Sequence, residues 1–286
     1  MGQQNKQRSN NKYHGLTIRK HKIKRWLWVS LIVFVIITLI AAALIVKWYL
    51  DGRKAKELSQ QASSTTTIER PASANAVNVN PPENKEDDYW RYIKMDMLSV
   101  DFNELLAKNS DTVGWIKING TSINYPIVQT TDNKYYLKHS FDKSGNGAGW
   151  IFADYRDNMT NFGRNTIIYG HARLDTIMFG SLKNILTSNW YNNKDNYIVK
   201  LSTPTSNTMW QVFSVYSIPA ESYYIQTDFT SDQQFGKFIQ VLKNRSEANF
   251  TANVNASDKI LTLSTCHDTI GLRVVMHAKL IKQEPR

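Results

Sequence analysis

The feature that most constrains this chain is a run of twenty uncharged residues, LWVSLIVFVIITLIAAALIV, from Leu27 to Val46. At about 1.5 Å of rise per residue, a helix of this length spans a hydrocarbon core of roughly 30 Å. A cleaved signal peptide has a shorter apolar region of about 7–15 residues. Trp and Tyr residues flank both ends of the run, and such rings favour the membrane interface. The sequence therefore predicts a transmembrane signal anchor over residues 26–50, and not a cleaved leader or a buried core helix.

Positive charge is concentrated before the apolar run. Residues 1–25 hold eight of the 35 Lys and Arg residues and none of the 24 acidic ones, so 27 basic residues remain against 24 acidic ones elsewhere. Basic residues before a span favour a cytoplasmic N-terminus. We therefore expect residues 1–25 to form a basic cytoplasmic tail of a single-pass cell-membrane protein with its remainder extracellular. The near-balance outside the tail disfavours nucleic-acid binding.

Composition changes again after the anchor. Residues 62–86 are rich in Ser, Thr, Asn and Pro and poor in large apolar side chains. Such a stretch buries too little surface to offset the entropy lost when it orders. We predict an extracytoplasmic, largely disordered spacer over residues 51–87 and one folded domain over residues 88–286.

The folded domain begins with helical spacing and then changes period. Apolar residues between 89 and 98 lie at helical spacing, and Asp101 with Glu104 predicts a second helix start. From Val113 the pattern alternates, and Asn119-Gly120 is typical of a type I′ hairpin turn. Strands are predicted over 114–118, 121–128, 149–153, 166–170, 197–201, 211–218, 260–265 and 273–281. About eight short strands predict a mainly β fold, a barrel with accessory helices.

Two further helices are expected between these strands. Residues 178–186 form one candidate. The stronger candidate covers residues 231–244, where Phe235, Phe238, Ile239 and Leu242 recur at the spacing of one helix face. This apolar face is expected to pack on the barrel and not to bind a ligand.

The single cysteine of the chain, Cys266, ends an alternating run, ILTLSTC. His171 ends another such run, NTIIYGH, and Arg273 begins the last predicted strand. If these strands are neighbours, the three side chains meet at one rim. A thiolate is a strong nucleophile, an imidazolium lowers the pKa of a nearby thiol, and arginine can stabilise an oxyanion. His139, His267 and His277 remain alternative partners for the thiol, and a lone cysteine can also be a buried small apolar side chain.

Several motifs together decide between these possibilities. TLSTC followed by an R-x-V strand resembles the signature of sortases, the transpeptidases that attach surface proteins to Gram-positive cell walls. VGWIKINGTSINYPIVQTTDNKYYL, GWIFADYRDN and NTIIYGHARLDTIMFGSL are similar to class B sortases, in the same order, over residues 88–282. The resemblance implies an eight-stranded sortase barrel with N-terminal helices and a long helix between the sixth and seventh strands. It also implies that His171, Cys266 and Arg273 are catalytic.

The resemblance also implies a substrate groove and partners. The positions that match by local motif are Asn133, Leu137, Tyr224, Ile225 and Ser264. The implied reaction cleaves a C-terminal sorting signal of a surface protein through a thioacyl-enzyme. An amine of the peptidoglycan precursor, or a pilin lysine, then accepts the acyl group. Neither a metal nor another cofactor is expected.

Two other functions fit parts of the sequence. An extracytoplasmic cysteine peptidase or L,D-transpeptidase acting on peptidoglycan would also use Cys and His. Those folds usually place the cysteine before its histidine or use a Gly-Cys element, whereas His171 here precedes Cys266 by 95 residues. A catalytically inactive, membrane-tethered binding module would keep the fold but bury the thiol.

Overall fold

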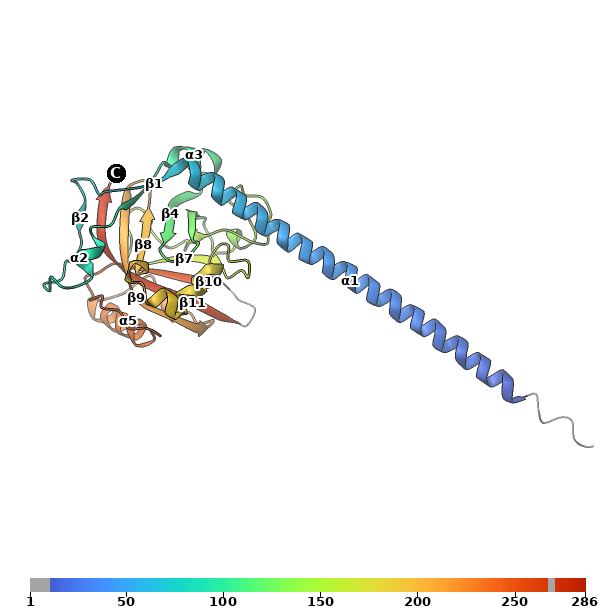
Figure 1. Cartoon of the computed structure of the whole chain (residues 1–286). Helices are drawn as coiled ribbons and strands as arrows, with labels where there is room; N and C mark the ends of the chain where they lie inside the picture. The colour runs from blue at the N-terminus through green and yellow to red at the C-terminus, as the bar shows by residue number, and fades with distance from the viewer. Residues whose placement is uncertain (1–10, 267–270) are drawn as a thin grey trace, which may run out of the picture. The chain divides into compact units, whose positions relative to one another are not determined.

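The structure is a computed structural model that describes residues 11–266 and 271–286 (Figure 1). Its compact units divide between Leu50 and Asp51. Helix α1 (Asn11–Thr66) contains the apolar run and crosses this division. Within the described residues, Lys24–Ser64 is the one helical stretch that is long and apolar enough to cross a membrane, with a mean hydropathy of 3.2 in its best window.

The second unit is built around a closed barrel of eight strands. They are β4 (Thr112–Ile118), β5 (Asn124–Val128), β6 (Phe152–Ala153), β7 (Asn165–His171), β8 (Ile198–Ser202), β9 (Ser206–Pro219), β10 (Ile260–Cys266) and β11 (Leu272–Pro285). Their order is β10-β7-β6-β5-β4-β8-β9-β11, and β11 pairs back onto β10. Closure leaves no unpaired edge in this ring. The predicted eight-stranded barrel is therefore confirmed.

Two pairs in the barrel are parallel, β5 with β6 and β7 with β10, and the other pairs are antiparallel. The parallel pair β7–β10 matters most for the site, because parallel strands end at the same edge. The barrel is filled by a large apolar cluster that includes the fully buried rings of Trp115, Trp150 and Trp210.

Helix α5 (Asp232–Asn244) lies between the sixth and seventh barrel strands, as predicted. The Oγ of Ser231 accepts a hydrogen bond from the backbone N–H of Gln234 at 3.2 Å and so caps the helix. The predicted apolar face is buried and shares a cluster with residues of β9, β10 and β11. The amphipathic pattern therefore predicted both the helix and its buried face correctly.

The remaining helices are short. They are α2 (Tyr89–Tyr92), α3 (Phe102–Lys108), α4 (Ser188–Tyr191) and the 3₁₀ turns η1 (Tyr135–Leu137), η2 (Gly180–Leu186), η3 (Lys194–Asn196) and η4 (Tyr223–Ile225). Asp101 caps α3, as its sequence suggested. The helix expected over residues 178–186 is the 3₁₀ turn η2.

The segment expected to be a disordered spacer differs most from the prediction. Helix α1 continues to Thr66, and strands β1 (Thr67–Arg70) and β2 (Val77–Asn78) follow. Strand β1 pairs with β3 (Met97–Val100), and β2 pairs with β11. Glu69 forms ion pairs with Lys117 and Lys200 of the barrel. The partners that order this polar segment lie far away in the sequence, which is why its composition suggested disorder.

Two local predictions near the start of the domain were also wrong. The apolar residues between 89 and 98 do not form one helix, because α2 ends at Tyr92 and Met97 begins β3. The β4–β5 connection is not a type I′ turn: Gly120 has a φ of +71°, whereas Asn119 is not among the residues with positive φ.

Because residues 51–83 are ordered against the barrel, we expect their removal to lower the stability of the domain. The Glu284 side chain is buried, and it accepts hydrogen bonds from Arg70 at 3.1 Å and from the Ser73 N–H at 2.6 Å. A chain that begins at Asn84 lacks both donors, so part of a buried charge is left unpaired. We expect its melting temperature to be at least about 5 °C below that of a chain that begins at Asp51. Equal melting temperatures would show that residues 51–83 do not stabilise the barrel.

Candidate active site

Cys266 and His171 are register partners at the ends of two adjacent strands. In the parallel pair β7–β10, Cys266 lies beside His171. Residues opposite each other in a parallel pair project their side chains to the same face. The thiol and the imidazole therefore emerge side by side at the edge where both strands end, as the sequence predicted for neighbouring strands.

The His171 ring is held by a backbone carbonyl. Its Nε2 lies 2.8 Å from the carbonyl oxygen of Leu137, the last residue of the turn η1. A carbonyl oxygen only accepts hydrogen bonds, so Nε2 must carry the proton. The other ring nitrogen, Nδ1, is then the atom that can gain or lose a proton. The backbone of Leu137, one of the predicted groove residues, thus sets the tautomer of His171.

Gly149 provides the space for this ring. Its φ is +61°, and a Cβ at this position would lie 2.7 Å from Cδ2 of His171 and 2.7 Å from the carbonyl oxygen of Tyr136. Both the backbone conformation and the close contact therefore require glycine. The sequence contains this glycine within the quoted motif GWIFADYRDN, but a glycine alone did not point to the imidazole.

Replacement of Gly149 by alanine should displace the His171 ring. We expect kcat/KM for peptide cleavage to fall about 10²-fold, because a misplacement of about 1 Å at a reacting group has an effect of this size. Gly145, whose Cβ would meet nothing within 4 Å, is the matched control. Gly145→Ala should keep nearly full activity, and a fully active Gly149→Ala protein would contradict the proposed role of this contact.

Burial dominates the electrostatics of the pair. Burial raises the pKa of the Cys266 thiol to about 12, and the positive charge of Arg273 lowers it in part. Burial lowers the pKa of His171, the hydrogen bond to Leu137 raises it, and the charge of Arg173 lowers it further. At neutral pH the resting pair is therefore a thiol beside a neutral imidazole, and the thiolate–imidazolium pair is a minor form.

This protonation state predicts a pH profile for alkylation of Cys266. Iodoacetamide reacts with the thiolate, and an ordinary cysteine is half ionised near pH 8.5. Because the pKa of Cys266 is raised, the alkylation rate should still increase at pH 10 in the native protein. Arg273→Gln removes a charge that favours the thiolate and should slow the reaction at any given pH. A rate plateau below pH 8.5 would instead indicate a stable thiolate–imidazolium pair.

Arg273 lies near the start of β11 and lines an open hollow of about 550 Å³. The hollow is lined by Ala220, Glu221, Ser222, Tyr223, Ile225 and Arg273. The Nη1 of Arg273 donates to the hydroxyl of Tyr224 at 3.3 Å. Its Nε is buried and has no hydrogen-bond partner within the described part of the chain. The positive charge of this guanidinium is near enough to lower the pKa of the Cys266 thiol.

The predicted groove residues divide into two kinds. Ile225 lines the hollow. Tyr224 and Ser264 are fully buried, and the hydroxyl of Tyr224 lies 3.1 Å from the Oγ of Ser264. The Tyr224 hydroxyl accepts from Arg273, so it joins the buried Ser264 to the guanidinium that lines the hollow.

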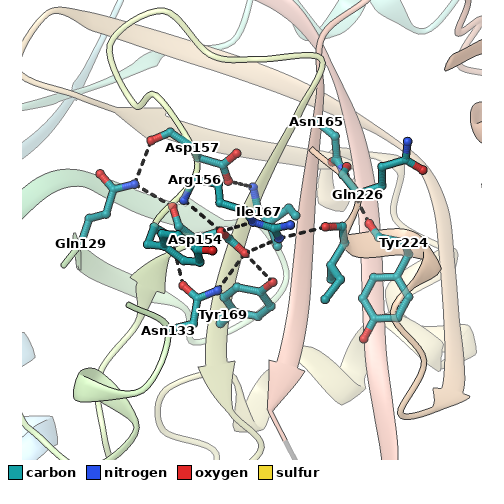
Figure 2. Close-up of polar contacts among 12 residues, drawn as sticks. Gln129, Asn133, Asp154, Arg156, Asp157, Asn165, Ile167, Tyr169, Tyr224 and Gln226 are labelled. Atoms are coloured by element: carbon teal, nitrogen blue, oxygen red, sulfur yellow. Dashed lines mark hydrogen bonds and ion pairs between the residues drawn. The ribbon is translucent and has the colours of Figure 1, made fainter. Parts of the chain in front are cut away.

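Asn133 is also held by the protein itself. Its Nδ2 donates to Asp154 at 2.9 Å, and its Oδ1 accepts from the N–H of Tyr155 at 3.0 Å. Figure 2 shows that Asp154 is the centre of this network. The fully buried carboxylate of Asp154 also accepts from the Tyr169 hydroxyl at 2.9 Å and from the Arg156 Nε at 2.8 Å.

Arg156 connects this network to the hollow. Its Nη2 donates both to Asp154 at 2.8 Å and to the carbonyl oxygen of Ile225 at 3.0 Å. Asp154 and Arg156 were not predicted as site residues. The signal that could have found them is the D-x-R sequence after the strand in GWIFADYRDN, since paired charges that follow a buried strand need partners.

The alternative histidines have other partners. His277 is fully buried within β11, with Nε2 2.8 Å from the Tyr216 hydroxyl and Nδ1 2.9 Å from the Thr262 Oγ1. The ring of His139 stacks on Tyr135 at 4.0 Å. His267, and Asp268 beside it, lie outside the described residues. Of the histidines in described strands, His171 is the register partner of Cys266. No group of three or more potential metal ligands occurs among the described residues.

The comparisons with known proteins agree with this geometry. A family model described as "Sortase domain" matches residues 116–281. Sortase B of Staphylococcus aureus (strain NCTC 8325 / PS 47) is 32% identical over 264 residues, which cover 91% of this chain and 99% of that protein. Sortase B of Listeria monocytogenes is 35% identical over 184 residues, which cover 63% of this chain and 74% of that protein.

Solved structures give the same result. The crystal structure of sortase B from Bacillus anthracis in complex with AAEK1 superposes with a TM-score of 0.66 at 32% identity. The match covers 82% of this chain and 99% of that chain. The similarity thus extends over the barrel and the elements that precede it.

Proposed function

Because the chain belongs to the class B sortases, a family of cysteine transpeptidases, we propose that Cys266 is its nucleophile and that it cleaves a C-terminal sorting signal of surface proteins. The Nδ1 of His171 takes the proton of the Cys266 thiol as the Sγ attacks the carbonyl carbon of a threonine in that signal. The peptide C–N bond then breaks, the leaving amine takes a proton from His171, and a thioacyl-enzyme remains. The observation that carries this proposal is the register pairing of Cys266 with His171 beside Arg273.

His171 acts as acid and then as base through Nδ1, because its Nε2 proton is engaged with the Leu137 carbonyl. In the second half-reaction an amine attacks the thioester and loses a proton to the imidazole, and the Cys266 thiolate leaves. The resting thiol and neutral imidazole together hold the one proton that the cycle moves. Consequently no external proton donor or acceptor is required.

Arg273 stabilises the negative oxygen of the tetrahedral intermediates. Two observations support this role: Arg273 lines the hollow, and its positive charge lowers the pKa of Cys266. The guanidinium is fixed by the Tyr224 hydroxyl before substrate arrives, and such preorganised donors are the most effective ones.

The acceptor is an amine of the cell wall, on a peptidoglycan precursor, or a pilin lysine. The apolar stretch within Lys24–Ser64 supports a single-pass anchor in the cell membrane. The basic residues that precede it support a cytoplasmic N-terminus and an extracellular catalytic domain. Such an anchor would keep the enzyme where exported proteins and wall precursors meet.

The test is product analysis by mass spectrometry. The full chain in detergent micelles is incubated with a library of sorting-signal peptides and with triglycine or an Nα-blocked lysine as acceptor. Cleavage after threonine, with the acyl group recovered on one of the two amines, is the expected result. Cleavage inside stem peptides of peptidoglycan, with no cleavage of any sorting signal, would support a peptidoglycan cysteine peptidase instead.

A further inference from the structure

The turn η4 forms one wall of the hollow beside Arg273, and strand pairing does not fix its position. Two side chains hold its backbone: Arg156 donates to the carbonyl oxygen of Ile225 at 3.0 Å, and the buried Asn165 donates to the carbonyls on either side of it. The Nδ2 of Asn165, at the start of β7, donates to the carbonyl oxygens of Tyr224 at 3.2 Å and of Gln226 at 2.9 Å. Figure 2 shows Asn165 facing this segment. The position of η4 therefore depends on the orientation of the Asn165 amide.

The orientation of that amide is set by a buried hydroxyl on the neighbouring strand β10. The Oδ1 of Asn165 accepts the hydroxyl proton of Thr262 at 2.6 Å. Thr262 has one hydroxyl proton, which this bond uses. Its oxygen must therefore accept a hydrogen bond from His277 Nδ1, which lies at 2.9 Å. His277 therefore carries its proton on Nδ1. Thr262 and His277 are register partners on β10 and β11.

The other side of the His277 ring leads back to the same turn. The Tyr223 hydroxyl donates to the Tyr216 hydroxyl at 2.9 Å, so the single proton of Tyr216 points to His277 Nε2 at 2.8 Å. Nε2 is thus the acceptor, as the Nδ1–H tautomer requires. His277 is fully buried, and burial lowers its pKa to about 3, which keeps the ring neutral at neutral pH.

These donors all point the same way around a closed path. The path leaves η4 at the Tyr223 hydroxyl and runs over the face of the sheet that α5 covers, through Tyr216, His277, Thr262 and Asn165. It returns to the η4 segment at the carbonyls on either side of Ile225. Hydrogen bonds aligned in such a chain polarise and strengthen one another. Only a side chain with a donor on one side and an acceptor on the other can occupy the place of His277.

We propose that His277 is a positioning residue that fixes the η4 wall of the substrate hollow through this closed path of hydrogen bonds. The inference rests on the proposed function, since it assigns the hollow beside Arg273 to the sorting signal. His277 touches neither Cys266 nor substrate. Its loss should therefore weaken substrate binding more than it slows the chemical step.

The first test uses kinetics of the full chain in detergent micelles. His277→Leu removes one hydrogen bond from each of the buried hydroxyls of Tyr216 and Thr262 and should raise KM for a sorting-signal peptide about 10- to 100-fold. The kcat value should change less than KM. Tyr223→Phe removes one hydrogen bond at the half-buried end of the path and should raise KM about fivefold. Because Tyr223→Phe leaves the core intact, it keeps the test valid if His277→Leu folds poorly.

Thr208→Val is the control for a buried hydrogen bond in β9 that lies outside the path. The Thr208 Oγ1 donates to Leu201 O at 2.8 Å, and this variant should keep the KM of the unaltered protein. His277→Gln, whose amide oxygen can still accept from Tyr216, should recover part of the loss. The proposal would be wrong if the KM values of His277→Leu and Tyr223→Phe both lay within twofold of the KM of Thr208→Val.

A second readout does not require catalysis. Hydrogen exchange measured by mass spectrometry should show faster exchange in residues 220–226 of His277→Leu, with β7 unchanged. If the unaltered protein cleaves no sorting signal, the proposed function fails, but exchange still tests the path. If exchange in residues 220–226 is the same in His277→Leu and Thr208→Val, the path does not hold η4, whatever the enzyme cleaves.

Discussion

Replacement of His171 by alanine is expected to lower kcat/KM for peptide cleavage by at least about 10³-fold without unfolding the barrel. The imidazole both takes the thiol proton and returns it to the leaving amine, and each loss of acid–base catalysis typically costs about 10²–10⁴ in rate. His171 is only partly buried at a strand end, so its loss removes little of the core. Steady-state kinetics and circular dichroism measure the two effects separately.

Other histidines provide the controls. His139→Ala removes a ring that stacks on Tyr135 and is expected to cost less than tenfold in kcat/KM. His267→Ala should also retain substantial activity. An inactive His267→Ala protein together with an active His171→Ala protein would overturn the assignment, because the histidine adjacent to the thiol would then be the acid and base.

Replacement of Arg273 by lysine is expected to be nearly as damaging as replacement by alanine, at about 10²–10³ in kcat. Lysine keeps the charge that lowers the pKa of Cys266 but lacks the planar fork of donors. In arginine, Nη1 donates to the Tyr224 hydroxyl while the rest of the guanidinium lines the hollow, and one ammonium group cannot fill both positions. Single-turnover measurement of peptide cleavage separates this effect from substrate binding.

Two variants serve as the reference points for Arg273. The guanidinium of Arg164 lies outside the hollow and pairs with Asp232 of α5 at 2.5 Å. Arg164→Lys should therefore cleave the peptide at nearly the rate of the unaltered protein. If Arg273→Lys were as active as Arg164→Lys while Arg273→Ala was inactive, then a positive charge near Cys266 would be sufficient and the oxyanion role would be wrong.

Local patterns predicted the barrel well because each strand carries its own signal. Alternation and turn residues located the eight barrel strands, and the spacing of Phe235 and Leu242 located α5 and its buried face. The ends of the runs ILTLSTC and NTIIYGH placed Cys266 and His171 at strand ends. Their pairing could not be derived from periodicity, because it depends on the parallel register of β7 and β10.

The errors arise where distant residues decide the local structure. Residues 51–87 are ordered through strand pairing and through ion pairs such as Glu69 with Lys117. These partners lie elsewhere in the sequence, so the composition of the segment does not reveal them. Likewise, Tyr224 and Ser264 were predicted as groove positions from local motifs, and the structure shows that both side chains are buried, with the Tyr224 hydroxyl bonded to Arg273. Sequence matching locates such residues near a groove and does not show which atoms face it.

The most direct measurement is the intact mass of the protein after incubation with a sorting-signal peptide in the absence of an acceptor amine. Cys266 is the only cysteine in the chain, so a thioester has one possible site. We expect the protein mass to increase by the mass of the peptide fragment that ends in threonine. Hydroxylamine should release this fragment, and Cys266→Ala should form no adduct. Peptide cleavage that survives in Cys266→Ala, with no adduct on the unaltered protein, would contradict the thioacyl mechanism.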